Sequence, residues 1–419
     1  MINSNAHKKH LTTILCLFLS FAVLLNFTGC SMKVEANDLM KGINGATIEP
    51  KEADDTFIAH SFDFAVTLFK NSIDNKENSL ISPLSVMLAL AMTANGANGA
   101  TKTEMETLLG GDIPLEDLNA YLHTYANSLS STKDAKLSIA NSIWFRDTPA
   151  LHVEPSFLQT NADFYQAAAY KATFDEQTVQ DINYWVSKNT DGMIDSIIDS
   201  IDNDTIMFLI NAIAFDAKWK TPYMTIDVSD RSFTSFDEVV QVSPFMNGIE
   251  TIYLQDETTT GFIKPYKENY SFVALLPNEG ITLSDYIESL TSEQFANLLS
   301  NATSASVNTY LPKFSYEYEI QMNQILCDLG MPTAFGPADF LKLGHSSEGN
   351  IYIGEVLHKT YISLDEEGVK AAAVTSVEMK IEYAPMYDYT VNLDRPFVYA
   401  IIDNATNLPF FIGTVTSLH

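Results

Sequence analysis

The side chains that most often perform chemistry in proteins are sparse in this sequence and poorly spaced. Eight histidines are spread over the 419 residues, and beyond the first thirty residues no two of them are spaced to bind one metal ion from a single helix face. The HExxH, CxxC and Walker-type motifs are absent. We therefore expect no catalytic metal centre and no cofactor.

Two local clusters resemble parts of hydrolase sites. His345 precedes Ser346 in a glycine-flanked segment, but the spacing is not that of GxSxG and no strand precedes it. The acidic residues 365–367 are consecutive, so they cannot flank a glycosidic bond from opposite sides. We interpret the first cluster as a surface loop and the second as the solvated end of a strand. The sequence thus favours a protein that is not an enzyme.

The composition describes a large folded domain with an acidic surface. Apolar residues make up 46% of the chain and charged residues 18%, with 24 Lys plus Arg against 53 Asp plus Glu, a net charge of −29. Such a surface repels phosphate backbones and anionic lipid headgroups, which excludes nucleic acid as a partner. Three cysteines cannot build a disulfide framework, so stability must come from packing.

The N-terminus is typical of an exported protein. Lys8 and Lys9 precede an apolar run over residues 11–27, and small residues then lead to Cys30. The stretch 27–30 resembles a bacterial lipobox, which implies cleavage after Gly29, lipidation of Cys30 and anchoring at the bacterial cell surface. The alternative is an ordinary secretory signal with an incidental cysteine. We predict a signal peptide over residues 1–29, a flexible tether over 30–55 and one domain over 56–419.

The domain must combine helices and strands. Helical periodicity predicts helices over 57–70, 83–96, 178–189 and 316–329, with Ser82 as N-cap of the second. Runs of β-branched and aromatic residues predict strands over 138–145, 207–215, 252–254, 271–276, 306–311, 360–364 and 397–402. Helices dominate early and strands late, which indicates an α+β fold with large mixed or antiparallel sheets.

An alternating segment follows Gly368. The odd-numbered positions 369–381 are small or apolar, whereas the even-numbered set becomes charged toward its C-terminal end. This period of two over some fifteen residues is typical of a strand with one buried face, and it is much longer than the usual strand. It describes either a long permanent strand or a segment that is able to enter a sheet.

The same segment resembles the reactive-centre loop of serpins. Residues 366–375 read EEGVKAAAVT, and the usual serpin hinge reads EEGTEAAAAT. Further serpin blocks occur in order along residues 57–416: NSLISPLS at 78–85, NAIAF at 211–215 followed by Lys218-Trp219, LPKF at 311–314, His358-Lys359, and Arg395-Pro396-Phe397. The chain is therefore identified as a member of the serpin family.

This resemblance implies a fold and a mechanism. Serpins have three β-sheets, eight or nine helices and an exposed reactive-centre loop, and they act as suicide substrates of serine proteases. The protease cuts the loop and is trapped as an acyl-enzyme while the loop inserts into central sheet A. The resemblance assigns the hinge to Glu367, Gly368, Val369, Ala371, Ala372, Ala373 and Thr375, the shutter beneath the sheet to Ser82, Ser85, Asn211 and His358, and the breach to Trp219.

Insertion of the loop into sheet A requires that the hinge residues facing the protein interior carry no charge. An unpaired charge buried there would cost several kcal/mol. Val369 is neutral although the family usually has Thr there, and Ala371, Ala373 and Thr375 are small, while Lys370 is expected to face solvent. Non-inhibitory relatives often carry a charge or proline at such positions. The sequence thus favours a monomeric inhibitor over the alternative, a non-inhibitory serpin acting as a surface binding or structural module.

The usual serpin hinge length places the cleaved bond between Glu382 and Tyr383. A glutamyl-specific or broad-specificity serine protease would suit this bond. Lys380-Ile381 would instead attract a trypsin-like enzyme and Tyr383-Ala384 a chymotrypsin-like one. Cysteine proteases also form acyl intermediates and stay open as targets.

Overall fold

The computed structural model describes residues 33–74, 76–129, 132–202, 205–368 and 386–418. The chain divides into the units Met1–Val34 and Glu35–His419, and only the second is described in any detail. Of the sequence predictions, the signal peptide, Cys30, the reactive bond at Glu382-Tyr383 or Lys380-Ile381, and the hinge residues Val369, Ala371, Ala372, Ala373 and Thr375 lie outside the described residues.

The described residues form nine α-helices and two short 3₁₀ helices. Caps begin several of them: the side chain of Asp54 accepts a hydrogen bond from Phe57 N–H at the start of α2, and that of Ser82 accepts one from Ser85 N–H at the start of α3. The helices are α2 (Asp55–Ser72), α3 (Pro83–Ala94), α4 (Gly99–Gly110), α5 (Leu115–Ser128), α6 (Pro155–Tyr165), α7 (Glu176–Asn189), α8 (Leu283–Ser289), α9 (Ser292–Ser300), α10 (Asn323–Asp328), η1 (Thr225–Asp227) and η2 (Pro332–Phe335).

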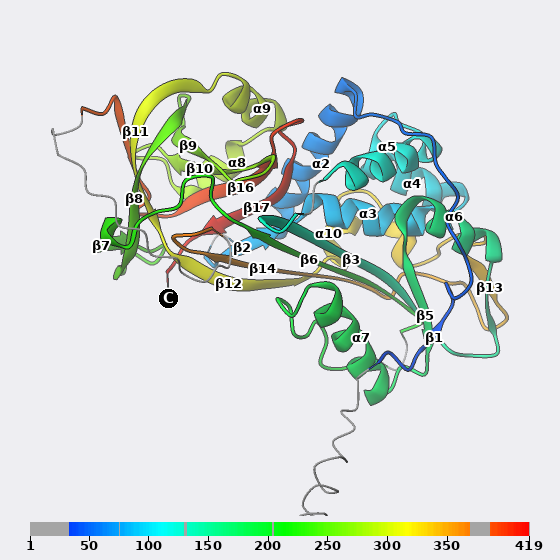
Figure 1. Ribbon diagram of the computed structural model, residues 1–419. Coiled ribbons are helices and arrows are strands. Elements are labelled where there is room, and N and C mark those ends of the chain that lie inside the picture. The colour runs from blue at the N-terminus through cyan, green and yellow to red at the C-terminus, as the bar shows by residue number, and fades with distance from the viewer. Residues whose placement is uncertain (1–32, 75, 130–131, 203–204, 369–385, 419) are drawn as a thin grey trace, which may run out of the picture. The chain divides into compact units, whose positions relative to one another are not determined.

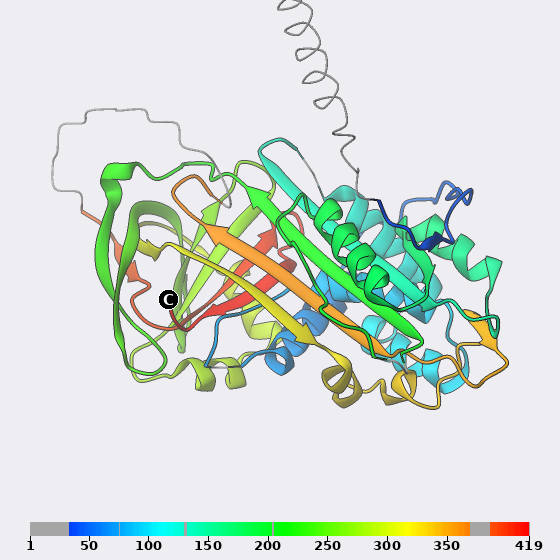
Figure 2. The same cartoon turned by 90° about the horizontal axis from the view of Figure 1, so that it is seen from below.

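A six-stranded sheet crosses the domain. Its strands lie in the order β1-β5-β3-β6-β14-β12, and β6 and β14 run parallel to each other in its middle (Figure 2). Along β6 only Asp216 is not buried, which explains its nearly continuous apolar sequence. The strands are β1 (Asn37–Asp38), β3 (Ala135–Arg146), β5 (Ala168–Ala172), β6 (Met207–Ala217), β12 (Phe314–Gln321) and β14 (Glu355–Leu364).

A second, nine-stranded sheet packs beside it, with the order β15-β11-β8-β9-β10-β16-β17-β2 and β7 paired to β8. A third sheet contains only β4 and β13. The expected three sheets are thus present. The strands are β2 (Ser79–Ile81), β4 (Leu151–Val153), β7 (Val228–Thr234), β8 (Val240–Gln255), β9 (Thr259–Pro265), β10 (Tyr270–Pro277), β11 (Thr303–Pro312), β13 (Gly344–Ser346), β15 (Tyr389–Asn392), β16 (Phe397–Asp403) and β17 (Pro409–Val415).

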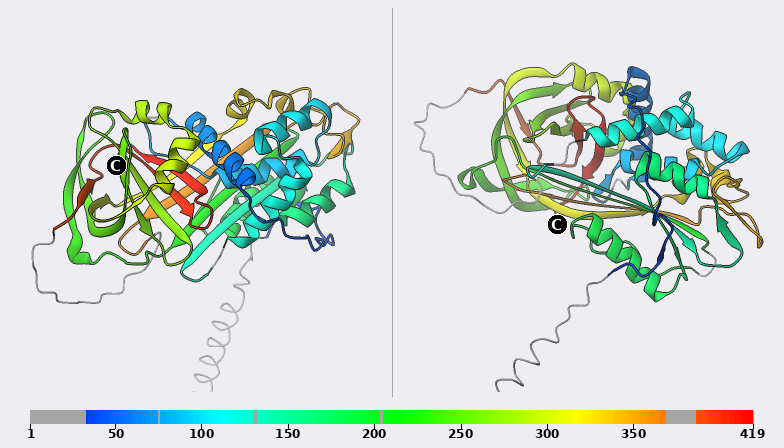
Figure 3. Two further views of the ribbon diagram at one scale, coloured as in Figure 1. Left: turned by 90° about the horizontal axis from the view of Figure 1, so that it is seen from above. Right: turned by 45° about the vertical axis from the view of Figure 1, so that its right-hand side comes forward.

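Helices cover both faces of the six-stranded sheet (Figures 1 and 3). Every residue of α3 is buried, because this helix lies between that sheet and the helices around it. The helix α7 packs against the opposite face beside β3. Side chains of α3 therefore reach the underside of the seam between β6 and β14.

Two sequence predictions were wrong in detail. Residues 316–329 do not form one helix, because Phe314–Gln321 is a strand and only Asn323–Asp328 is helical. The burial of this strand alternates residue by residue, so the period of two in FSYEYEIQ was the informative signal. The predicted loop at 344–349 contains the strand β13, in which His345 pairs with His152 of β4.

The described part of the predicted tether is bound along the domain. Asn37 and Asp38 pair with Lys171 and Tyr170 at the edge of the six-stranded sheet, and the carboxylate of Asp181 accepts hydrogen bonds from two N–H groups of this segment. Farther along, Ala46 N–H donates to Asp163 Oδ1 and Lys51 N–H donates to Thr124 Oγ1. The predicted flexible tether over 30–55 is therefore bound to the domain at several points between residues 35 and 51. None of the described helices is long and apolar enough to span a bilayer.

Candidate functional site

The centre of the candidate site is the seam between β6 and β14. These strands are direct hydrogen-bonded neighbours from the pair Glu355 and Phe208 to the pair Tyr361 and Ala214. Along these pairs no other strand lies between them, so the sheet is closed in its middle. Beyond them, a single antiparallel bridge joins Lys218 to Gly368. The chain therefore arrives at the open end of this seam at the residue where the alternating segment begins.

The predicted shutter residues meet beneath this seam. Asn211 and His358 are direct register partners across it. Together with Ser82, the N-cap of α3, and Ser85 of that helix, they are completely buried. Ser82 N–H donates to His358 Nε2 at 3.0 Å, and Asn211 Nδ2 donates to Ser85 Oγ. Two neighbouring strands and one helix are thus joined through a single polar cluster.

The protonation state of His358 follows from its partners. A backbone N–H is only a donor, so Nε2 must accept and the ring proton lies on Nδ1, which donates to Asn211 Oδ1. Burial lowers the pKa of this histidine from 6.5 to about 3. The ring is therefore neutral at physiological pH, and a second proton would remove the acceptor that Ser82 needs.

Sequence reasoning missed one member of this cluster. Asn141 of β3 is the register partner of Asn211, and its Oδ1 accepts a hydrogen bond from Asn211 Nδ2. It extends the polar cluster to a third strand. The available signal was an amide among the small and apolar residues of 137–145.

The predicted breach residue Trp219 holds the open end of the seam. Its indole is completely buried and stacks on Tyr266, with ring centroids 4.3 Å apart. Its backbone N–H donates to Glu367 O at 2.8 Å and its Nε1–H to Asp365 O at 2.9 Å. Trp219 thus binds the turn that follows β14 directly through two hydrogen bonds.

A second set of contacts holds the same turn. Tyr223 N–H donates to Glu366 O at 2.9 Å, and Lys313 Nζ lies 3.0 and 2.8 Å from the two carboxylate oxygens of Glu366. Although burial alone would raise the pKa of Glu366, the hydrogen bonds from Lys313 lower it. Glu366 is therefore half-buried and paired with Lys313 instead of fully solvated. The sequence placed Lys313 in the LPKF block but did not predict this ion pair.

Gly368 is required by its surroundings. Its φ is +140°, and a Cβ added there would lie 2.0 Å from Ala217 O. Its N–H donates to Asp365 Oδ1 at 3.2 Å, and its carbonyl accepts from Asp365 N–H at 2.8 Å. Only glycine permits the hinge to approach the end of β6 this closely.

We expect Gly368→Ala to destabilise the folded protein by about 1–3 kcal/mol, because it combines a positive φ with a backbone clash. Urea unfolding followed by circular dichroism measures this change. Gly349→Ala is the matched control, since Gly349 has a φ of +142° with nothing within 4 Å of its added Cβ. Equal effects of the two substitutions would show that the contact with Ala217 is unimportant.

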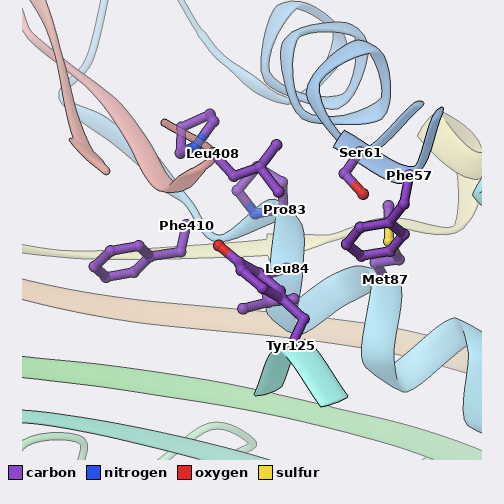
Figure 4. Close-up of a pocket in the computed structure, with 9 residues that line it drawn as sticks. Phe57, Ser61, Pro83, Leu84, Met87, Tyr125, Leu408 and Phe410 are labelled. Atoms are coloured by element: carbon purple, nitrogen blue, oxygen red, sulfur yellow. The ribbon is translucent and has the colours of Figure 1, made fainter. Parts of the chain in front are cut away.

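The structure also shows how the hydrolase-like pair His345 and Ser346 is arranged. His345 and Ser346 are consecutive residues of β13 and point to opposite faces, while Ser346 Oγ accepts from Glu348 N–H. Among the described residues no group of three His, Cys, Asp or Glu side chains is arranged to hold a metal ion. A small pocket beside the start of α3 contains no charged side chain in its lining (Figure 4).

Comparison with known proteins identifies this arrangement. Residues 59–418 match the family model described as serpin, a serine protease inhibitor. An uncharacterised serpin-like protein of Thermococcus kodakarensis is 30% identical over 84% of this chain and 83% of its own. The plasma serine protease inhibitor of Bos taurus is 29% identical over 81% and 85%.

Solved structures agree with the family match. The thermophilic serpin tengpin in its native state is 53% identical, with a TM-score of 0.89 over 92% of this chain and all of that one. Tengpin in its latent state is equally identical in sequence, with a TM-score of 0.79 over 88% of this chain and all of that one. The chain belongs to the serpin family and has the serpin fold.

Proposed function

We propose that this protein inhibits serine proteases as a suicide substrate, as is established for serpins in general. A target protease cuts the segment after Gly368 and becomes acylated. The freed segment then enters the six-stranded sheet between β6 and β14 and carries the protease with it. The inward-facing hinge positions, Val369, Ala371, Ala373 and Thr375, carry no charge. This absence of charge favours inhibition over a non-inhibitory role.

The observation that carries the proposal is the closed seam that ends at the bridge between Lys218 and Gly368. If this antiparallel pairing continued along β6 after cleavage, the residues that follow Gly368 would enter the seam. β6 runs from Met207 to Ala217, which at about 3.3 Å per residue is a path of roughly 36 Å. The bridge therefore supports one entrance, one direction and one register for the proposed insertion.

The energy for insertion comes from the sheet itself. In the described conformation, β6 and β14 share one ladder of hydrogen bonds. A strand between them would replace this one ladder by two, and it would bury the apolar face of the inserted segment. The described state is then held by a kinetic barrier, to which the shutter and the breach contribute.

The comparison with tengpin supports this assignment. At the same 53% identity, the TM-score is 0.89 with its native structure and 0.79 with its latent structure. This difference supports the proposal that the described conformation is the one that precedes insertion.

The cleaved bond and the location are further parts of the proposal. We propose cleavage at Glu382-Tyr383 by a glutamyl-specific or broad-specificity protease, with Lys380-Ile381 as the alternative. We also propose that cleavage after Gly29 and lipidation of Cys30 anchor a monomeric protein at the bacterial surface. Membrane fractionation of wild type and Cys30→Ala tests the anchor, because only the wild type should sediment with membranes.

Mixing the protein with a panel of serine and cysteine proteases tests the function. We expect a covalent complex that survives boiling in SDS, together with a C-terminal peptide whose mass identifies the cut. Proteases that cleave the loop and stay fully active would contradict inhibition and favour the non-inhibitory alternative.

A further inference from the structure

A buried ion pair lies next to the breach. Lys264 of β9 and Glu250 of β8 are only 3% and 7% exposed, and Lys264 Nζ is 2.8 Å from Glu250 Oε1. Burial of two charges is costly and rarely adds stability over an apolar pair. Neither residue belongs to the hinge, the shutter or the breach as the sequence predicted them.

The ammonium group of Lys264 contacts the turn after β6, residues 218–223, which we call the gate turn. Its Nζ donates to Thr221 O at 3.1 Å. The same Nζ lies 4.1 Å from the ring centroid of Tyr223 and 5.1 Å from that of Trp219. Both distances allow attraction between the cation and the ring. One buried charge therefore contacts three residues of the gate turn.

The gate turn in turn holds the hinge. Its N–H groups at Trp219 and Tyr223 donate to the carbonyls of Glu367 and Glu366. Trp219 and Tyr223 are also the two residues whose rings lie beside Lys264 Nζ. The gate turn thus lies between the ion pair and the hinge, and its position determines whether both hinge hydrogen bonds form.

We propose that Lys264, neutralised by Glu250, is a positioning residue that holds the gate turn against the hinge and so slows entry of the loop into the sheet. The part about loop entry rests on the proposed inhibitory function. Burial raises the pKa of Glu250 and lowers the pKa of Lys264, so each charge depends on its partner. Removing both charges together is therefore the informative change.

Hydrogen–deuterium exchange of the double variant Lys264→Met/Glu250→Gln tests the positioning role. This variant keeps the approximate side-chain volumes and removes the hydrogen bond to Thr221 O. We expect the amides of Trp219 and Tyr223 to exchange about tenfold faster, which corresponds to about 1.4 kcal/mol. The amides of β10 (Tyr270–Pro277), the neighbour of β9, should keep their wild-type rates.

A matched control neutralises another ion pair. Lys102→Met/Glu106→Gln removes the pair on α4, whose side chains are 32% and 24% exposed, and it should leave exchange at the gate turn unchanged.

Unchanged exchange in the Lys264 variant would overturn the proposal. Equally faster exchange throughout β10 would also overturn it, since the pair would then be a general stabiliser of the core. Should the first variant not fold, Lys264→Met/Glu250→Met serves the same comparison, because it also removes both charges and the donor to Thr221 O.

A second measurement separates this inference from the proposed function. The uncleaved Lys264→Met/Glu250→Gln protein is incubated below its melting temperature, and the fraction still unfolded by urea is followed over time. We expect the urea-sensitive form to disappear about tenfold faster than in wild type, and an unchanged rate would overturn the role in loop entry. If wild type inhibits no protease, the proposed function fails, whereas the exchange result still decides the positioning of the gate turn.

Discussion

Replacing Val369 with arginine is expected to convert the protein from an inhibitor into a substrate. In the register set by the bridge between Lys218 and Gly368, Val369 would enter the sheet opposite Ala217, which is completely buried. An unpaired arginine there costs several kcal/mol, and about 4 kcal/mol changes a ratio of outcomes about 1000-fold. The number of inhibitor molecules consumed per trapped protease measures this shift.

The neighbouring residue provides the control. Lys370 would enter opposite Asp216, the one β6 residue that is not buried, so Lys370→Arg should inhibit as well as the wild type. Both variants should still be cut at the same bond. Undiminished trapping of protease by Val369→Arg would contradict insertion in this register.

Acidification is expected to weaken the folded state through His358. Burial holds its pKa at about 3 in the folded protein against 6.5 as the ordinary value. Between these pH values the unfolded chain binds a proton that the folded protein does not bind, so stability falls as the pH drops from about 6.5 toward 3. From pH 7 to pH 4 the loss amounts to about 3 kcal/mol.

Urea unfolding at a series of pH values measures this loss, with His358→Gln as the comparison. Glutamine offers an acceptor for Ser82 N–H and a donor for Asn211 Oδ1 but does not titrate. The difference in unfolding free energy between wild type and variant should therefore depend on pH by about 3 kcal/mol between pH 7 and pH 4. Parallel pH profiles would show that His358 is not the responsible group.

The residues assigned to the shutter and the breach could be chosen from the sequence because each lies in a block that resembles the family. Ser82, Ser85, Asn211 and His358 come from three distant segments, yet they form one buried cluster. No periodicity argument could have brought these residues together. Their proximity depends on the pairing of β6 with β14, which is a long-range property of the chain.

Residues outside the familiar blocks escaped prediction for the same reason. Lys264 lies in the strand Thr259–Pro265 and reads as an ordinary strand lysine, and its burial depends on Glu250 of another strand. Asn141 likewise gains its role from Asn211 across the sheet. The error at residues 316–329 was different in kind, because the alternation of exposed and buried residues in β12 was visible in the sequence itself.

The same register gives the shutter a new occupant. Counting along β6 from the bridge between Lys218 and Gly368, Thr375 arrives opposite Asn211, in the gap between Asn211 and His358. One intervening strand moves these two residues from about 4.8 Å to roughly 9.6 Å between their strand axes, so their direct hydrogen bond must break. A threonine hydroxyl can both donate and accept a hydrogen bond. Inserted Thr375 could therefore bridge Asn211 and His358, so that three strands instead of two would share the hydrogen-bonded cluster.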